Sequence, residues 1–343
     1  MLRNFWYPLF FSTDLSSERL LAAKLFGEPL VLFRDSLGVV NTLFDRCPHR
    51  SVPLSLGRLC EGKIECMYHG WQFGAQGKCE YIPTHAAGEV IPKNAHVPSR
   101  PTVEKDGLIW VWAGQEEADF SLIPHYPELS SADYIITQSS IDVDVDYSLL
   151  LENLVDPSHV PFVHRNTLAT PDKAQPLHVE VIAMPDGGFR AEYQSTRTPA
   201  LPLPDFFAFE PPCHARAGKN DKSIVRLFHC VPIEKNRVRL LWWMAFRLAA
   251  LDSHLQKQLE TDEAIEQFKI KVIESQHQIY AEDLELLRAQ QMRIDQNAPA
   301  FGCPLKLDLL PLRCRKWREE HEHVDTWFES YQKPAHAKAN SRK

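Results

Sequence analysis

The hydrophobic positions in the first third of the chain fall into short runs that are separated by turn-forming residues. Apolar runs at residues 29–33, 39–43 and 108–112 are divided by Gly- and Asp-containing stretches, such as residues 35–38 and 106–107. Gly, Asp and Asn readily adopt the backbone angles of tight turns, so this pattern predicts short strands joined by turns. We therefore expect the N-terminal part of the chain to be a small all-β domain.

The later part of the chain combines a strand pattern with a helix pattern. The segment from residue 254 to about residue 294 carries Leu, Ile, Val and Phe among charged residues and contains no Gly or Pro. This pattern predicts one long helix. Strands are predicted at residues 178–184, 189–194, 223–231 and 237–246. Such strands would form one curved antiparallel sheet, and the predicted fold class is therefore α+β.

The length of the chain favours two domains, because 343 residues exceed the usual size of one. The strand-rich part is assigned to residues 1–115 and the mixed part to residues 132–332. A polar, acidic stretch at residues 116–131 is expected to link them. The polar residues 333–343 are expected to form a flexible tail.

Charge and hydropathy exclude several classes of protein. The net charge of −7 comes from interspersed charges of both signs, which argues against a nucleic-acid surface. The most apolar run, residues 240–246, is far shorter than the roughly 20 residues that a membrane-spanning helix needs. The N-terminus has no signal-peptide pattern. We therefore expect a cytoplasmic protein with no membrane span.

Two short motifs carry the clearest chemical signal. Cys47 and His49 form a C-x-H pair, and Cys66 and His69 form a C-x-x-H pair. Ligation by two Cys and two His suits either zinc or a Rieske [2Fe–2S] cluster, in which two His replace two Cys on one iron. Structural zinc sites usually pair Cys with Cys and His with His, whereas each motif here has one of each. The spacing therefore favours the Rieske cluster over zinc.

A second pair of histidines, His159 and His164, indicates a further metal site. On an ideal helix they would lie about 140° apart, but Pro161 between them is expected to break or widen the turn. Two His with one carboxylate form the facial triad of non-haem Fe(II) oxygenases, which leaves positions open for O₂. Spacing alone does not choose the third ligand. The candidates on the long predicted helix are Glu282, Asp283 and Glu285.

The residues around both motifs resemble those of one enzyme family. Cys-Pro-His-Arg, Tyr-His-Gly-Trp and the block from Asn153 to His164 are similar to segments of the catalytic α-subunits of Rieske non-haem iron oxygenases, which hydroxylate rings or remove methyl groups. Within this family the block looks most similar to vanillate O-demethylase, dicamba O-demethylase and pheophorbide a oxygenase-like members. The segment that starts at Glu282 also resembles the family pattern E-D-x-x-x-L-x-x-Q, whose Asp binds iron. On this resemblance the third ligand is Asp283. Glu282 and Glu285 are expected to lie on a solvated acidic face of the helix.

The resemblance also assigns roles to individual residues. The ligands of the [2Fe–2S] cluster would be Cys47, His49, Cys66 and His69. The ligands of the mononuclear Fe(II) would be His159, His164 and Asp283. Asp156 would hydrogen-bond one of the iron-binding His residues and reach a cluster His of a neighbouring subunit, and Asn153 matches a family position near the iron.

The resemblance implies a helix-grip-like catalytic domain and the function of a terminal oxygenase component. Such a protein uses O₂ and supplied electrons to hydroxylate or oxidatively demethylate an organic substrate, here expected to be apolar and aromatic or polycyclic. The chain has no Gly-rich dinucleotide fingerprint, so a ferredoxin, a flavin-dependent NAD(P)H reductase or both would supply the electrons. A homotrimer is also implied. The alternatives are a Rieske electron-transfer protein without a working mononuclear iron site and a zinc-binding structural protein.

Overall fold

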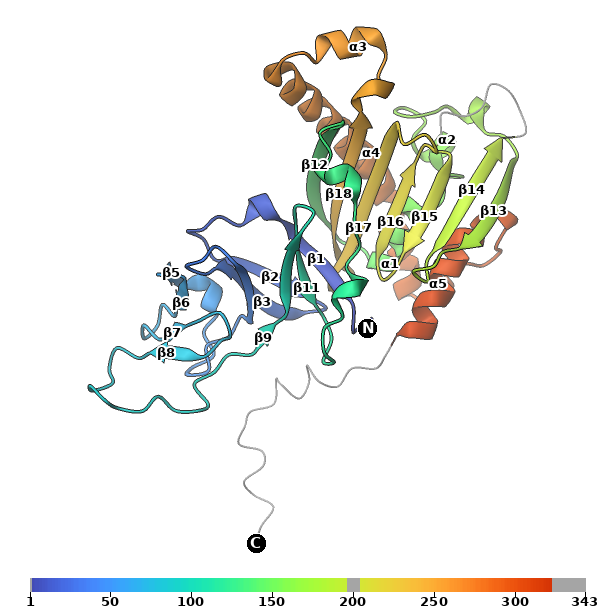
Figure 1. Ribbon diagram of the computed structural model, residues 1–343. Helices are drawn as coiled ribbons and strands as arrows, with labels where there is room; N and C mark the ends of the chain where they lie inside the picture. The colour runs from blue at the N-terminus through green and yellow to red at the C-terminus, as the bar shows by residue number, and fades with distance from the viewer. Residues whose placement is uncertain (1, 196–203, 323–343) are drawn as a thin grey trace.

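The computed structural model describes residues 2–195 and 204–322 (Figure 1). Short strands make up its N-terminal part, and the C-terminal part is built on one large antiparallel sheet with helices. The predicted α+β fold class is therefore confirmed. The predicted tail at residues 333–343 lies outside the described residues.

The N-terminal part consists of small antiparallel sheets. Its strands are β1 (Trp6–Phe11), β2 (Leu21–Leu25), β3 (Glu28–Arg34), β4 (Val40–Phe44), β5 (Arg58–Cys60), β6 (Lys63–Glu65), β7 (Gln72–Phe73), β8 (Cys79–Tyr81), β9 (Ser99–Arg100), β10 (Thr102–Lys105) and β11 (Leu108–Trp112). They pair in the orders β1-β11-β10, β2-β3-β4-β9 and β5-β6-β7-β8. The three apolar runs that were predicted as strands correspond to β3, β4 and β11.

The C-terminal part is a seven-stranded sheet with helices. Its strands are β12 (Tyr134–Val143), β13 (Leu177–Ala183), β14 (Phe189–Ser195), β15 (Phe206–Glu210), β16 (His214–Gly218), β17 (Ile224–Glu234) and β18 (Arg237–Arg247). Its helices are α1 (Tyr147–Leu154), α2 (Val160–Val163), α3 (Ser253–Gln258), α4 (Asp262–Asp295) and α5 (Leu309–His321). The strand order is β12-β18-β17-β16-β15-β14-β13. The four predicted strands are confirmed as β13, β14, β17 and β18.

Short 3₁₀ helices occur in several connections. They span Ser12–Asp14, Leu54–Leu56, Phe120–Leu122, Pro127–Ser130, Pro171–Lys173, Leu248–Ala250 and Lys306–Asp308. Two of them lie in the stretch that was predicted to link the two domains, so that stretch has local structure.

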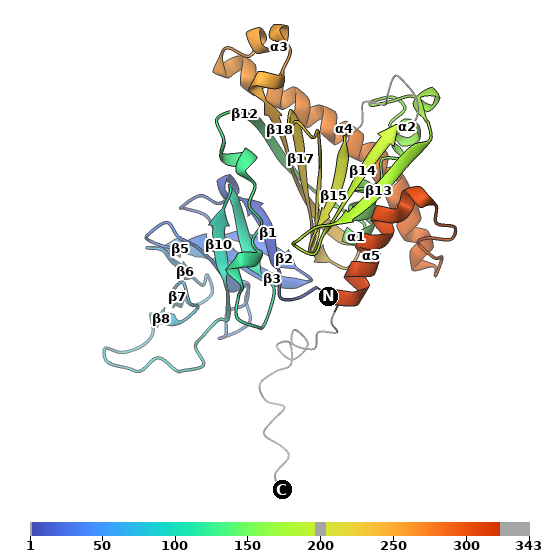
Figure 2. The ribbon, with the colours of Figure 1, turned by 45° about the vertical axis from the view of Figure 1, so that its right-hand side comes forward.

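The central strands of the large sheet are buried on both faces. On one side, Trp242 packs against Tyr280 of α4, with their ring centroids 5.9 Å apart. On the other side, Trp243 packs against Phe11 of β1, with the centroids 5.4 Å apart. Figure 2 shows the sheet between the N-terminal strands and α4. Successive side chains point to opposite faces of a strand, so a strand that is covered on both sides has a continuous apolar sequence. This explains the apolar run at residues 240–246.

The long helix that was predicted from residue 254 is interrupted, so this prediction was wrong at its start. α3 ends at Gln258 and α4 begins at Asp262. The side chain of Thr261 accepts a hydrogen bond from the backbone amide of Ala264 at 3.2 Å. This contact satisfies one of the free amides at the start of α4 and fixes where the helix begins. Hydrophobic periodicity alone does not detect a capping residue within a polar stretch.

A buried carboxylate joins the N-terminal strands to one another. The side chain of Glu28 is 1% exposed and accepts hydrogen bonds from Arg3 at 2.8 Å and from Arg100 at 2.7 Å. The two arginines also donate to the backbone carbonyls of Ala113 and Gly114. Next to Glu28, the backbone amide of Gly27 donates to Ile233 of β17. The charge cluster therefore lies where the N-terminal part meets the large sheet.

We expect Glu28→Ala to lower the free energy of unfolding by about 3–5 kcal/mol, because it removes the buried carboxylate that two guanidinium groups contact. Chemical denaturation followed by circular dichroism measures the loss. The control is Glu266→Ala, which removes an exposed ion pair with Lys269 and should cost at most about 1 kcal/mol. Equal losses in the two variants would contradict the role of Glu28.

Candidate functional site

The two Cys–His motifs lie in tight turns of the N-terminal part. The first follows β4, and the second connects β6 to β7. Each turn closes with a hydrogen bond to a Cys carbonyl, from Ser51 to Cys47 and from Gly70 to Cys66, both at 2.9 Å. Gly70 has a φ of 71°, which only glycine adopts without strain. The backbone therefore presents both motifs from stiff turns.

Within these turns the thiols lie inside and the imidazoles lie outside. Cys47 and Cys66 are each 2% exposed, whereas His49 is exposed and His69 is half-buried. The rings of His49 and His69 lie 4.5 Å apart, and Trp71 stacks on His49 with centroids 4.6 Å apart and planes 7° apart. Burial, with the neighbouring Cys66 thiol, raises the pKa of Cys47 to about 11. Two buried thiols with two more exposed imidazoles beside them fit the ligand types of a Rieske cluster, which uses two Cys and two His.

The second pair of histidines flanks a single helical turn. His159 precedes α2 and His164 follows it, and their ring centroids lie 5.2 Å apart. The short turn brings together two side chains that a regular helix would separate. Asp283 of α4 meets them, with its Oδ1 atom 3.4 Å from His159 Nε2 and 3.3 Å from His164 Nε2. Ligand atoms of all three residues lie within 4.8 Å of one another.

Both imidazoles are oriented by other carboxylates. His164 Nδ1 lies 2.9 Å from Glu282 Oε2, which also accepts a hydrogen bond from the Thr167 hydroxyl at 2.7 Å. Burial opposes a charge on His164, but the contacts with Asp283 and Glu282 outweigh it and raise the pKa of His164. Glu282 was expected to be a solvated acidic residue, and this prediction was wrong. No local pattern predicts this contact, because His164 and Glu282 are 118 positions apart in the chain.

Asp156 lies on the other side of the same centre. Its Oδ2 atom is 3.7 Å from His159 Nδ1, and its Oδ1 atom accepts a hydrogen bond from the Ser158 amide at 2.7 Å. Burial acts to raise the pKa of Asp156, but the contacts with His159 and Ser158 outweigh burial and lower it. Asp156 is therefore placed to hold the ring of His159, which agrees with one part of the role predicted for it.

Asn153 of α1 contacts the third member of the centre. Its side-chain amide donates to Asp283 Oδ1 at 3.1 Å, and its own Oδ1 atom has no hydrogen-bond partner in the described parts of the chain. The predicted position of Asn153 near the metal centre agrees with this contact. Its amide fixes the carboxylate between the two imidazoles.

The donor set fits a bound divalent metal ion. Glu282 lies within hydrogen-bond distance of His164 Nδ1, whereas Asp156 is 3.7 Å from His159 Nδ1, which has no hydrogen-bond partner among the described residues. Both Nε2 atoms face the same carboxylate oxygen of Asp283. Histidines that bind a metal usually donate their other ring N–H to a carboxylate, as the contact between His164 and Glu282 allows. Two imidazole nitrogens and one carboxylate match the facial triad of non-haem Fe(II) sites.

A cavity of about 270 Å³ opens beside this centre, and most of its walls are apolar. It lies between one face of the large sheet and the helices α1, α2 and α4. The apolar lining residues are Leu154, Val160, Leu168, Ala169, Pro204, Phe207, Ala217, Phe228 and Ile279. A largely apolar pocket with a few polar groups is typical of a site for a small organic molecule.

Models of two known families match the chain. Residues 5–101 match the Rieske [2Fe-2S] domain, and residues 143–323 match the vanillate O-demethylase oxygenase C-terminal domain. The Rieske match establishes a [2Fe–2S] cluster as a cofactor of the N-terminal part, and the triad of the second part fits a mononuclear iron. The predicted cofactors are therefore confirmed.

Known proteins of this kind resemble the whole chain or half of it. A chloroplastic chlorophyllide a oxygenase of Chlamydomonas reinhardtii is 33% identical over 92% of the chain, which spans 48% of that relative. The oxygenase component of dicamba O-demethylase from Stenotrophomonas maltophilia is 39% identical over 55% of each protein. The chain spans between about half and three-fifths of the chlorophyllide a oxygenases that it matches.

Solved structures resemble the complete fold. Dicamba monooxygenase bound to 3,6-dichlorosalicylic acid has a TM-score of 0.76 and 25% identity, over 96% of this chain and 99% of that one. NdmA of Pseudomonas putida CBB5 has a TM-score of 0.74 and 26% identity, over 93% and 90%. In the described ranges, no helix has both the length and the apolar character to cross a membrane. The chain belongs to the Rieske oxygenases whose catalytic part is a vanillate O-demethylase-type C-terminal domain.

Proposed function

We propose that the chain is the terminal oxygenase component of a Rieske system, which hydroxylates or oxidatively demethylates an apolar aromatic or polycyclic substrate with O₂. The observation that carries the proposal is the group of His159, His164 and Asp283 beside an apolar cavity. The names of the relatives support it, because they include a dicamba O-demethylase and a toluene-4-sulfonate monooxygenase system.

The residues of the centre have separate tasks in this proposal. The metal ligands would be His159, His164 and Asp283. A bound Fe(II) with three protein ligands supplies open positions at which O₂ can react beside the substrate. Asn153 and Glu282 hold the ligands in position, and the apolar walls of the cavity keep water away from the reacting atoms.

Electrons would enter at the exposed side of the predicted cluster, whose ligands are Cys47, His49, Cys66 and His69. A separate ferredoxin, flavin-dependent NAD(P)H reductase or both would deliver them. In Figures 1 and 2 the strands β5–β8, which flank the second motif, lie on the opposite side of the molecule from α2. This separation supports a head-to-tail homotrimer, in which Asp156 of one subunit would meet a cluster histidine of the next. The cytoplasmic location and the domain boundaries inferred from the sequence stay predictions.

The alternative is a Rieske electron-transfer protein without a working mononuclear site. Metal analysis separates the two functions, because a Rieske cluster contains two iron and two sulfide. We expect the purified chain to contain three iron and two acid-labile sulfide, and Asp283→Ala to lose one iron while it keeps the reducible red-brown cluster. Two iron in the wild-type protein after Fe(II) reconstitution would favour the electron-transfer alternative. Zinc without sulfide would exclude both.

Glu282→Ala should weaken binding of the mononuclear iron by about 10–100-fold, because the ring of His164 loses the carboxylate that orients it. Competition with an iron chelator under anaerobic conditions measures the affinity. Glu285→Ala is the matched control, since this residue lies exposed on the same helix and should leave the affinity unchanged. If both variants bind iron as the wild type does, Glu282 has no part in the site.

Asp156→Asn should lower substrate-dependent O₂ consumption by about 10–100-fold while both metal centres stay occupied. The amide keeps the size of the side chain but removes the negative charge beside His159. Turnover with a supplied reductase and iron content should be measured on the same sample. Loss of iron in parallel with activity would instead assign Asp156 to metal retention alone.

A further inference from the structure

One arginine that lines the cavity has no charged partner among the described residues. Arg226 of β17 lines the cavity, and among the described residues its guanidinium makes no hydrogen bond and no ion pair. Burial lowers the pKa of Arg226, and the nearby Tyr280 acts in the opposite direction. Burial also raises the pKa of Tyr280 well above its usual range, so the phenol is neutral and does not balance the charge.

The surrounding side chains leave room for a ligand beside this cation. Arg226 stands opposite Ala217 on β16, which stands opposite Phe207 on β15. These three residues form one row across the sheet, and all three line the cavity. The methyl group of Ala217 is too small to cover the guanidinium, so the space next to it belongs to the cavity.

The acidic residues of the cavity already have other partners. Asp283 contacts both iron-binding histidines, and Asp156 contacts His159 and Ser158. A bound metal ion would add positive charge to the same cavity and increase the cost of an unpaired guanidinium. The carboxylates that line the cavity are thus engaged elsewhere, and in the described parts of the chain none of them pairs with Arg226. This leaves Arg226 available to a negatively charged group of a bound molecule.

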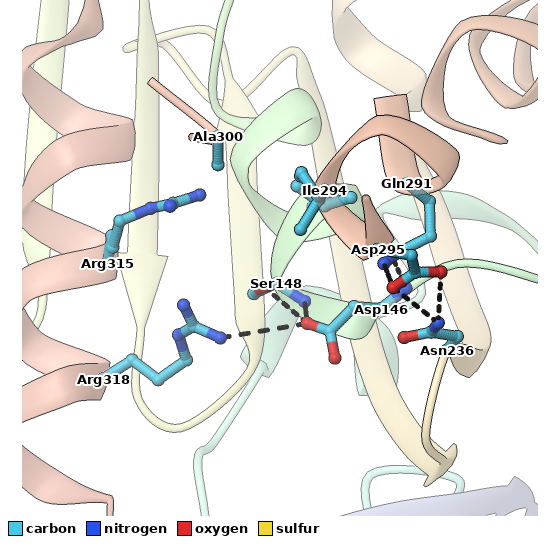
Figure 3. A pocket seen from close by; sticks show the side chains of 10 residues that line it. Asp146, Ser148, Asn236, Gln291, Ile294, Asp295, Ala300, Arg315 and Arg318 are labelled. Atoms are coloured by element: carbon cyan, nitrogen blue, oxygen red, sulfur yellow. Dashed lines mark hydrogen bonds and ion pairs between the residues drawn. The ribbon is translucent and has the colours of Figure 1, made fainter. Parts of the chain in front are cut away.

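In a second cavity of the same size, the arginines are paired with carboxylates of the chain. It is lined by Arg315 and Arg318 and has a volume of about 270 Å³. Arg318 lies 3.8 Å from Asp146 (Figure 3), and Arg315 is paired with Glu152 at 2.6 Å. Each of these arginines is therefore neutralised by a carboxylate of the chain itself. Arg226 differs, because no carboxylate in the described part of the chain pairs with it.

We propose that Arg226 binds a carboxylate group of the substrate and thereby orients the aromatic ring against the metal centre. The guanidinium fork matches a carboxylate in two parallel hydrogen bonds, and Phe207 and Phe228 provide apolar walls for the ring. Tyr280 precedes Asp283 by three residues, or about 4.5 Å along the helix axis. A compact aromatic acid could therefore contact Arg226 at one end and lie beside the metal ligands at the other. The inference rests on the proposed function only in taking this cavity as the substrate site.

Binding measurements with matched acids and amides test the inference. The probes are para- and meta-methoxybenzoate and the corresponding methoxybenzamides, which have nearly the same shape but differ in charge. Isothermal titration of the metal-loaded protein, without O₂ and without reductase, gives each dissociation constant. We expect the wild type to bind at least one acid more tightly than its amide by on the order of 10–100-fold.

Variants at position 226 separate charge from shape. Arg226→Met should remove the preference for the acid and leave the affinity for the amide unchanged, whereas Arg226→Lys should keep part of the preference. Arg288→Met is the control, because it removes an equal charge from the surface of α4. Arg226→Met should also not lower the melting temperature of the ligand-free protein, since no internal ion pair is lost.

Two results would overturn the inference. One is that no acid binds the wild type more tightly than its amide, and the other is that Arg226→Met keeps the preference. The binding measurements involve no turnover, so a separate assay of O₂ consumption distinguishes the two failures. A preference for the acid in a protein that never consumes O₂ would leave the inference intact and reject the proposed function. Turnover of the amides with equal binding of acids and amides would do the reverse.

Discussion

The catalytic part of the molecule is organised around one contact, in which two imidazole nitrogens approach the same carboxylate oxygen of Asp283. His159 Nε2 and His164 Nε2 lie 3.4 Å and 3.3 Å from that oxygen. Each of these groups loses hydration beside an apolar cavity, which costs free energy unless the group has a partner. A cation bound by all three, as proposed, would offset this cost, and the arrangement would then be more stable with the metal than without it.

The rest of the fold holds the two sides of this centre in place. The histidines lie at the ends of α2, whereas Asp283 belongs to α4, which packs on the large sheet through Tyr280 and Trp242. The opposite face of the sheet is covered by the N-terminal strands, so both faces are fixed by packing. A rigid support of this kind matters, because ligand geometry that is loose by about 1 Å weakens a metal site. The N-terminal part thus supports the catalytic part mechanically as well as carrying its own cluster.

The sequence was informative where the chemistry is local and uninformative where it depends on packing. The Cys47–His49 and His159–His164 patterns are readable because the paired residues lie within one turn of the chain. Glu282 was misjudged, because nothing near it in sequence shows that His164 would lie beside it. Arg226 lies near the start of β17, whose sequence is mostly apolar, and successive side chains of the strand point to opposite faces. Alternation identifies the face of the strand, but only the packed structure shows what covers that face.

The positions of the charged residues in the cavity favour one orientation of a bound ligand. Asp156, Glu282 and Asp283 surround the imidazoles, and Arg226 lies on the sheet with no ion pair to any residue that the structure describes. Apolar surface alone would bind an aromatic ring in many orientations, because the hydrophobic effect is not directional. A single buried cation makes one orientation more stable than the others, since a reversed ligand would leave both charges unpaired. In an oxygenase, orientation decides which carbon atom faces the metal. The same unpaired arginine can therefore determine both which molecules bind and where they react.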